Sequence, residues 1–190
     1  MPRIVDYKIV LDRLQSEGLK CHYFNGGAFG FSSEAGSFVR GWIGAEDGTI
    51  KPAAREFMRP VPEPFEENLT ELAVKVWQGH LAGEVWVMPK SHWWFELNEG
   101  SKEWLPGLVQ RIGLGAADLK SRNNAAAIEF SSIETNEFRQ FLRGLLENLS
   151  VSDFLMAFPG RDTICTIHQH KQLWWVTKSA DLLHGLDQMC

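Results

Sequence analysis

Two histidines two positions apart, His168 and His170, are the side chains whose type and spacing best suit metal chemistry. On an extended strand, residues i and i+2 point to the same face with about 7 Å between them. Two imidazoles at that separation can bind one divalent transition metal ion, which would make the chain a metal-dependent, hydrolase-like enzyme. A third ligand is required, and the sequence offers only isolated side chains for it: His22, His92, Asp162 and Glu129. The alternative is that the two histidines are polar residues of a hairpin turn.

The other reactive side chains form no catalytic motif. Cys165 lies in the same segment, but strand alternation places it on the opposite face from His168 and His170. A cysteine in an apolar strand is usually a small buried hydrophobe. The glycine-rich run at residues 26–30 lacks the spacing of a phosphate-binding loop, so it is expected to form a hairpin turn. These patterns favour binding over catalysis.

The tryptophans are the strongest indication of a binding role. The chain has 8 Trp, and two doublets, Trp93-Trp94 and Trp174-Trp175, fall in segments that are expected to be strands. Neighbouring residues on a strand face opposite ways, so each doublet places an indole on both sides of its sheet. Together with Trp42 and Trp86, they would form an aromatic binding surface if one face is exposed. If helices cover both faces, the same residues are core packing.

Hydrophobic periodicity predicts helix-then-strand units that position these side chains. Apolar residues recur at helical spacing in five predicted helices, which span residues 6–17, 68–80, 101–112, 138–149 and 179–186. Short apolar runs bounded by turn residues predict strands at residues 19–24, 28–32, 37–43, 84–88, 92–97, 126–131, 153–158, 163–168 and 172–176. Because short links make neighbouring strands antiparallel, we expect an α+β protein. Its helices should pack on an antiparallel or mixed sheet built from α-β-β(-β) units.

The chain of 190 residues is expected to form a single compact domain, residues 1–190. A proline-rich crossing at residues 51–66 interrupts the regular elements. Similar fragments at residues 85–91 and 173–179 also fit two related halves, 1–113 and 114–190. The element order of residues 1–113 is similar to that of small acidic secretion chaperones, a resemblance in element order that implies nothing about activity.

Charge and cysteine content narrow the classes of partner. The net charge is −5, from 19 basic and 24 acidic residues with no basic cluster, which disfavours nucleic acid and anionic membrane surfaces. Three cysteines at wide spacings are no disulfide framework, and no apolar run is long enough to span a bilayer. We therefore expect a cytoplasmic protein.

The leading hypothesis is a non-enzymatic binding or adaptor protein that receives a protein segment on an aromatic-rich sheet and needs no cofactor. One alternative is the metal-dependent hydrolase-like enzyme at His168 and His170. Another is a sensor for a small apolar ligand, bound in a pocket between sheet and helices. The sequence leaves open whether the sheet is shared in a homodimer.

Overall fold

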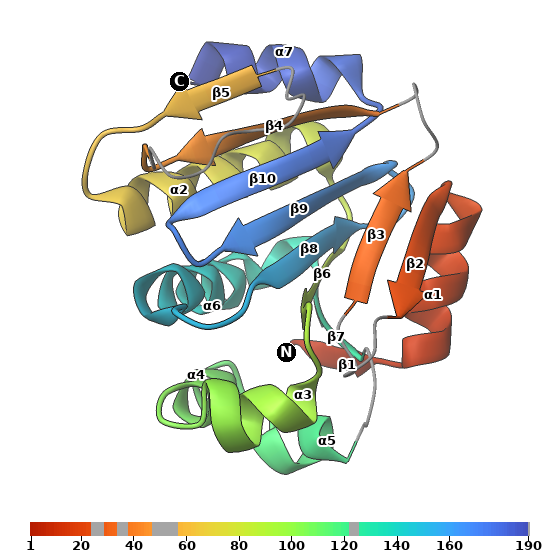
Figure 1. Ribbon diagram of the computed structural model, residues 1–190, viewed down its shortest axis with the longest axis vertical. Coiled ribbons are helices and arrows are strands. Elements are labelled where there is room, and N and C mark those ends of the chain that lie inside the picture. Colours follow the sequence, from red (N-terminus) through yellow and green to blue (C-terminus); the bar gives the residue numbers. More distant parts are fainter. Residues whose placement is uncertain (24–28, 34–37, 47–56, 122–125, 190) are drawn as a thin grey trace.

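The computed structural model describes residues 1–23, 29–33, 38–46, 57–121 and 126–189 (Figure 1). These residues contain one eight-stranded mixed sheet, in which only the β4–β5 pair is parallel. The strand order is β1 (Arg3–Val5), β7 (Ala127–Phe130), β6 (Val85–Pro89), β8 (Phe154–Phe158), β9 (Thr163–His168), β10 (Gln172–Thr177), β4 (Val39–Gly44) and β5 (Phe57–Pro60). A separate hairpin contains β2 (Leu19–Tyr23) and β3 (Phe29–Ser33). The predicted α+β class is confirmed, and the two predicted halves both contribute strands to the large sheet.

Helices lie on both faces of the large sheet. The first face is covered by α2 (Phe65–Val76), which continues as a π-helix, η1 (Trp77–Leu81), and by α6 (Thr135–Asn148) and α7 (Ala180–Met189). The second face is covered in part by α1 (Tyr7–Ser16), which lies beside the β2–β3 hairpin. The remaining helices gather near one end of the sheet: α3 (Trp93–Phe95), the π-helix η2 (Glu96–Gly100), α4 (Leu105–Arg111) and α5 (Ala116–Lys120). A 3-10 turn, η3 (Ser132–Glu134), leads into α6. None of the described helices is long and apolar enough to cross a membrane.

Strand alternation divides the buried side chains into two apolar cores. On β9, Cys165 and Ile167 face the core beneath α2 and α6, whereas Ile164 packs in the second core with Val10 and Leu14 of α1. Both cores are needed because every central strand buries apolar side chains on its two sides. The chain therefore forms a helix–sheet–helix sandwich whose second helical layer is the smaller one.

The segment at residues 92–97 corrects one prediction, because it is helical rather than a strand. The ring of His92 caps α3, since its Nδ1 accepts a hydrogen bond from the Phe95 N–H at 3.0 Å. Aromatic residues favour strands, but this local cap and the burial of Trp93 override that preference here. Residues 113–125, for which the sequence predicts no helix or strand, contain α5. Most of the predicted turn at residues 26–30 and residues 51–56 of the crossing fall outside the described part of the chain, while residues 57–60 of the crossing form β5.

The close packing of α4 on α6 depends on Gly144. A Cβ atom at this position would lie 2.5 Å from Cδ1 of Leu108, inside van der Waals contact. We expect Gly144→Ala to lower the free energy of unfolding by about 1–3 kcal/mol through overpacking, measured by urea denaturation. Gly107→Ala in α4 is the matched control, because a Cβ there meets nothing within 4 Å. It should raise stability by about 0.5–1 kcal/mol, and equal stability of the two variants would contradict this account.

Candidate functional site

Four of the six tryptophans of the predicted binding surface are buried in the fold: Trp42 (6% exposed), Trp86 (4%), Trp93 (0%) and Trp175 (0%). Trp94, on α3, has 46% of its surface exposed, and Trp174, on β10, is partly buried. An aromatic binding surface can therefore draw only on Trp94 and Trp174. For the other four, core packing accounts for the residue type.

Trp174 lies on the second face of the sheet, and within the described part of the chain it is not a member of either cluster of buried apolar residues. Its indole ring is stacked on the imidazole of His168, with ring centroids 4.3 Å apart and planes inclined by 6°. The indole N–H donates to Oε1 of Gln172 at 2.7 Å, and the Gln172 amide in turn donates to the Ala45 carbonyl at 2.6 Å. Because Gln172 is itself buried, these bonds hold the indole in one orientation.

His170 completes this group, and we call His168, His170 and Trp174 the aromatic platform. The two imidazoles meet edge to face, with centroids 4.8 Å apart. The backbone N–H of His170 donates to Nδ1 of His168 at 3.2 Å, which leaves Nε2 of His168 directed toward Asp153 Oδ1 at 3.9 Å. A nitrogen that already accepts a hydrogen bond is a poor general base. The geometry therefore orients His168 for contact more than for proton transfer.

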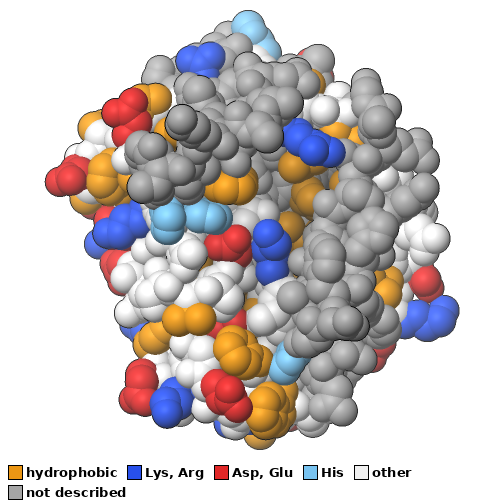
Figure 2. All heavy atoms as spheres, viewed as in Figure 1, with side chains coloured by type: hydrophobic (Ala, Val, Ile, Leu, Met, Phe, Trp, Pro, Cys, Tyr) orange, Lys and Arg blue, Asp and Glu red, His pale blue; other side chains and the backbone are white. Residues whose placement is uncertain are grey.

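Asp153 connects the platform to neighbouring strands. It accepts a hydrogen bond from the Gln169 N–H at 3.2 Å, and its second oxygen lies 3.6 Å from Nζ of Lys90. The backbone N–H of Lys90 also donates to the Asp153 carbonyl at 2.9 Å. Figure 2 shows histidine side chains next to acidic and basic ones on this side of the molecule. The β9–β10 turn is thus held against the ends of β6 and β8.

A second ion pair holds the same turn from the other side. Lys171, which has a positive φ of 57°, binds the carboxylate of Glu66 in α2. The hydrogen bond from Lys171 lowers the pKa of Glu66, with help from a backbone hydrogen bond and against the effect of burial. Contacts from β8 and from α2 therefore fix the position of the platform, which makes it a rigid surface.

The predicted metal pair is adjacent in space, but His170 lies in the turn after β9 rather than on the strand. The described residues contain no group of three His, Cys, Asp or Glu side chains that could hold a metal ion. The four proposed third ligands either have other contacts or are not described. His92 caps α3, and Glu129 binds Arg3. Asp162 lies 4.0 Å from Lys178, and the side chain of His22 is outside the described set. The metal site stays a prediction. Cys165 is completely buried and burial raises the pKa of its thiol well above the usual value, which keeps it protonated.

A buried carboxyl group beside the platform carried no clear signal in the sequence. Glu96, on η2, has no exposed surface and accepts hydrogen bonds from the hydroxyls of Ser91, Ser101 and Ser152. Ser91 follows Lys90 and Ser152 precedes Asp153, so this serine cluster adjoins the Lys90–Asp153 pair. The only local hint was a glutamate among bulky apolar residues, flanked by serines. Glu96 ties η2 to the ends of β6 and β8.

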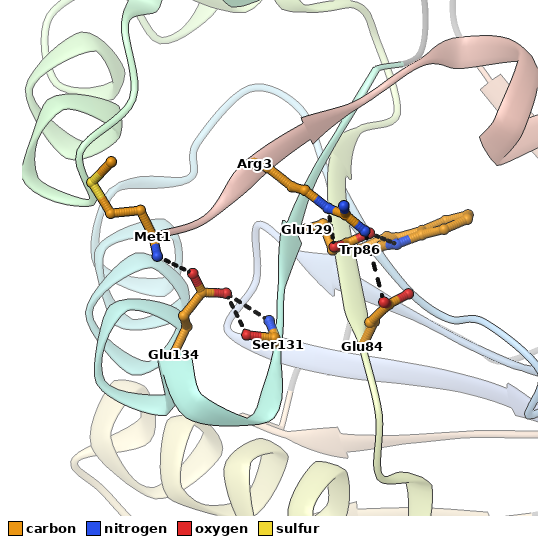
Figure 3. A network of polar contacts seen from close by, with 7 residues as sticks. All are labelled: Met1, Arg3, Glu84, Trp86, Glu129, Ser131 and Glu134. Atoms are coloured by element: carbon orange, nitrogen blue, oxygen red, sulfur yellow. Dashed lines mark hydrogen bonds and ion pairs between the residues drawn. The ribbon is translucent and has the colours of Figure 1, made fainter.

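A separate polar network at the β1 edge has a structural role (Figure 3). Arg3 forms ion pairs with Glu129 and Glu84, and Trp86 donates its indole N–H to Glu129 at 3.1 Å. Nearby, Glu134 caps η3 through Ser131. These contacts close the short edge strand against β7.

Comparison with known proteins gives no relative to guide assignment. No protein-family model matches the chain, and no curated protein or solved structure shows significant similarity to it. The functional argument therefore rests on the geometry of the chain itself.

Proposed function

We propose that this chain is a non-enzymatic binding protein that receives a basic, arginine-containing protein segment on the aromatic platform. The observation that carries the proposal is the parallel stack of Trp174 on His168, on the second face of the sheet. An indole held flat in one orientation is the best side-chain surface for a guanidinium group. The platform is thereby suited to recognition without any reaction.

Charge supports the same class of partner. The protein carries a net charge of −5, which attracts a basic segment over long range and repels an acidic one. Asp153 adds a carboxylate next to the platform, with a side chain that remains 19% exposed.

Selection of displayed peptides on the whole protein tests this proposal. Peptides with arginine are expected to be enriched, and their affinity, measured by fluorescence anisotropy, should fall roughly tenfold in Trp174→Ala. Trp94→Ala is the matched control, because it removes the more exposed tryptophan from α3 and should leave affinity unchanged. Circular dichroism of each variant checks that it folds, and Trp174→Leu serves if the alanine variant does not.

Two outcomes would overturn the proposal. One is a set of selected peptides without arginine. The other is equal affinity of the selected peptides for the wild-type protein and the folded Trp174 variant. An increase in affinity with added salt would also contradict an attraction between opposite charges.

A further inference from the structure

A concave site lies at the β5 edge of the large sheet, between the end of β5 and α2. Its volume is about 360 Å³, which is at the small end of the range for ligand pockets. The lining residues come from the chain that follows β5 and from one face of the helix: Pro60, Val61, Pro62, Asn68, Glu71, Leu72 and Lys75. This position corresponds to the pocket between sheet and helix that the small-ligand alternative requires.

The four helical residues occupy positions i, i+3, i+4 and i+7 of α2, so they form one continuous wall. Asn68 donates its side-chain N–H to the Pro62 carbonyl at 2.9 Å, which fixes the opposite wall against the helix. Leu72 and Val61 supply apolar surface between them. The pocket is therefore preformed, with an apolar interior and a polar rim.

The two charged residues of the rim, Glu71 and Lys75, differ in their ion pairing. Glu71 is bound by Arg139 of α6, with N–O distances of 2.7 and 3.5 Å. Lys75 is exposed and forms no ion pair or hydrogen bond with any other part of the chain that the structure describes. The uncompensated charge at the pocket is thus a single ammonium group, which attracts an anion.

The neighbouring strand edge disfavours a peptide as the occupant. The Val61 N–H donates to the Gly44 carbonyl, so strand alternation turns the backbone groups of Pro60 away from β4. Proline has no N–H, and this removes a donor that an added strand would need. A discrete small molecule fits this edge better than an extended chain.

From these features we infer that the β5–α2 pocket binds a small monocarboxylate with an apolar or aromatic body. The carboxylate pairs with Lys75, and the apolar body packs against Val61 and Leu72. One ammonium group suits one carboxylate, whereas phosphate sites gather several donors. This site is independent of the aromatic platform and adds a small-molecule ligand to the proposed function.

Titration of the ¹⁵N-labelled full chain with phenylacetate and with 4-methylpentanoate tests the inference. Amide shifts are expected at Asn68, Leu72 and Lys75, with a Kd of roughly 1 mM or lower. Phenylacetamide, which has the same body without the charge, should bind about threefold to fivefold more weakly. Lys75→Gln should weaken phenylacetate binding by a similar factor, because it removes the charge of an exposed ion pair.

Lys102→Gln is the matched control, since Lys102 is also an exposed lysine but lies outside the pocket. It should bind as the wild type does. The inference is overturned if shifts scatter over surface lysines, if Lys75→Gln binds equally well, or if no saturation occurs by about 10 mM. Trp174→Ala should retain carboxylate binding, so failure of the peptide proposal and failure of this one are distinguishable.

Discussion

Replacing Trp93 with alanine is expected to lower the free energy of unfolding by about 3–5 kcal/mol. The side chain has no exposed surface, and its ring meets Phe154 edge to face with centroids 5.8 Å apart. Its indole N–H donates to the Ala126 carbonyl at 2.6 Å. Alanine would leave a cavity and a buried carbonyl without that donor, and both effects destabilise the native state. Urea denaturation, monitored by circular dichroism, measures the change.

Trp94 provides the control in the next position of the chain. With 46% of its surface exposed, it should tolerate alanine at a cost within about 0.5 kcal/mol. Trp93→Phe, which keeps most of the ring volume but loses the donor, should fall between the two. If Trp93→Ala and Trp94→Ala had similar effects, the burial of Trp93 and the exposure of Trp94 would be contradicted.

The Trp93-Trp94 doublet also shows why part of the fold could not be predicted from the sequence. A strand and a short helix both place neighbouring aromatic residues on different sides, so the doublet alone cannot distinguish them. The distinguishing contacts are the His92 cap and the bond from Trp93 to Ala126, which lies 33 positions away in the chain. Such contacts exist only after folding.

The central strands were predictable because both faces are buried. The run at β8, Phe154–Phe158, is apolar throughout and buried at every position, which gives a continuous hydrophobic signal. The α6 helix was predictable for the complementary reason, since its apolar residues form one stripe. The three-residue strand β1 was missed because so short a run contains no periodicity.

The candidate site was predictable only where it is local. His168 and Trp174 belong to neighbouring strands joined by a short turn, and the pairing of His168 with Gln172 brings them together. Asp153 and Lys90 required the adjacency of β6 and β8, which are separated in the sequence by β7 and by the helical elements α3, η2, α4, α5, η3 and α6. No local pattern encodes that adjacency.

Glu96→Ala is expected to cost about 2–4 kcal/mol of the free energy of unfolding. The carboxyl group accepts hydrogen bonds from three serine hydroxyls, of which only the Ser101 contact, at 2.8 Å, has an ordinary length. Its removal leaves these hydroxyls without an acceptor in a site closed to solvent, and it empties the space that the side chain fills. Relief of the cost of burying a carboxyl group offsets part of this loss, which is why the estimate stays below that for Trp93.

Glu99→Ala is the matched control, because Glu99 lies on the same π-helix but is exposed. It should change stability by less than about 0.5 kcal/mol. Glu96→Gln keeps the shape and one acceptor oxygen, so it should lose roughly half as much as alanine. Because Ser91 and Ser152 adjoin Lys90 and Asp153, Glu96→Ala should also loosen the β9–β10 turn and speed hydrogen exchange at the Gln169 amide. Unchanged exchange at Gln169 in a destabilised Glu96→Ala protein would show that the serine cluster supports η2 alone and not the platform.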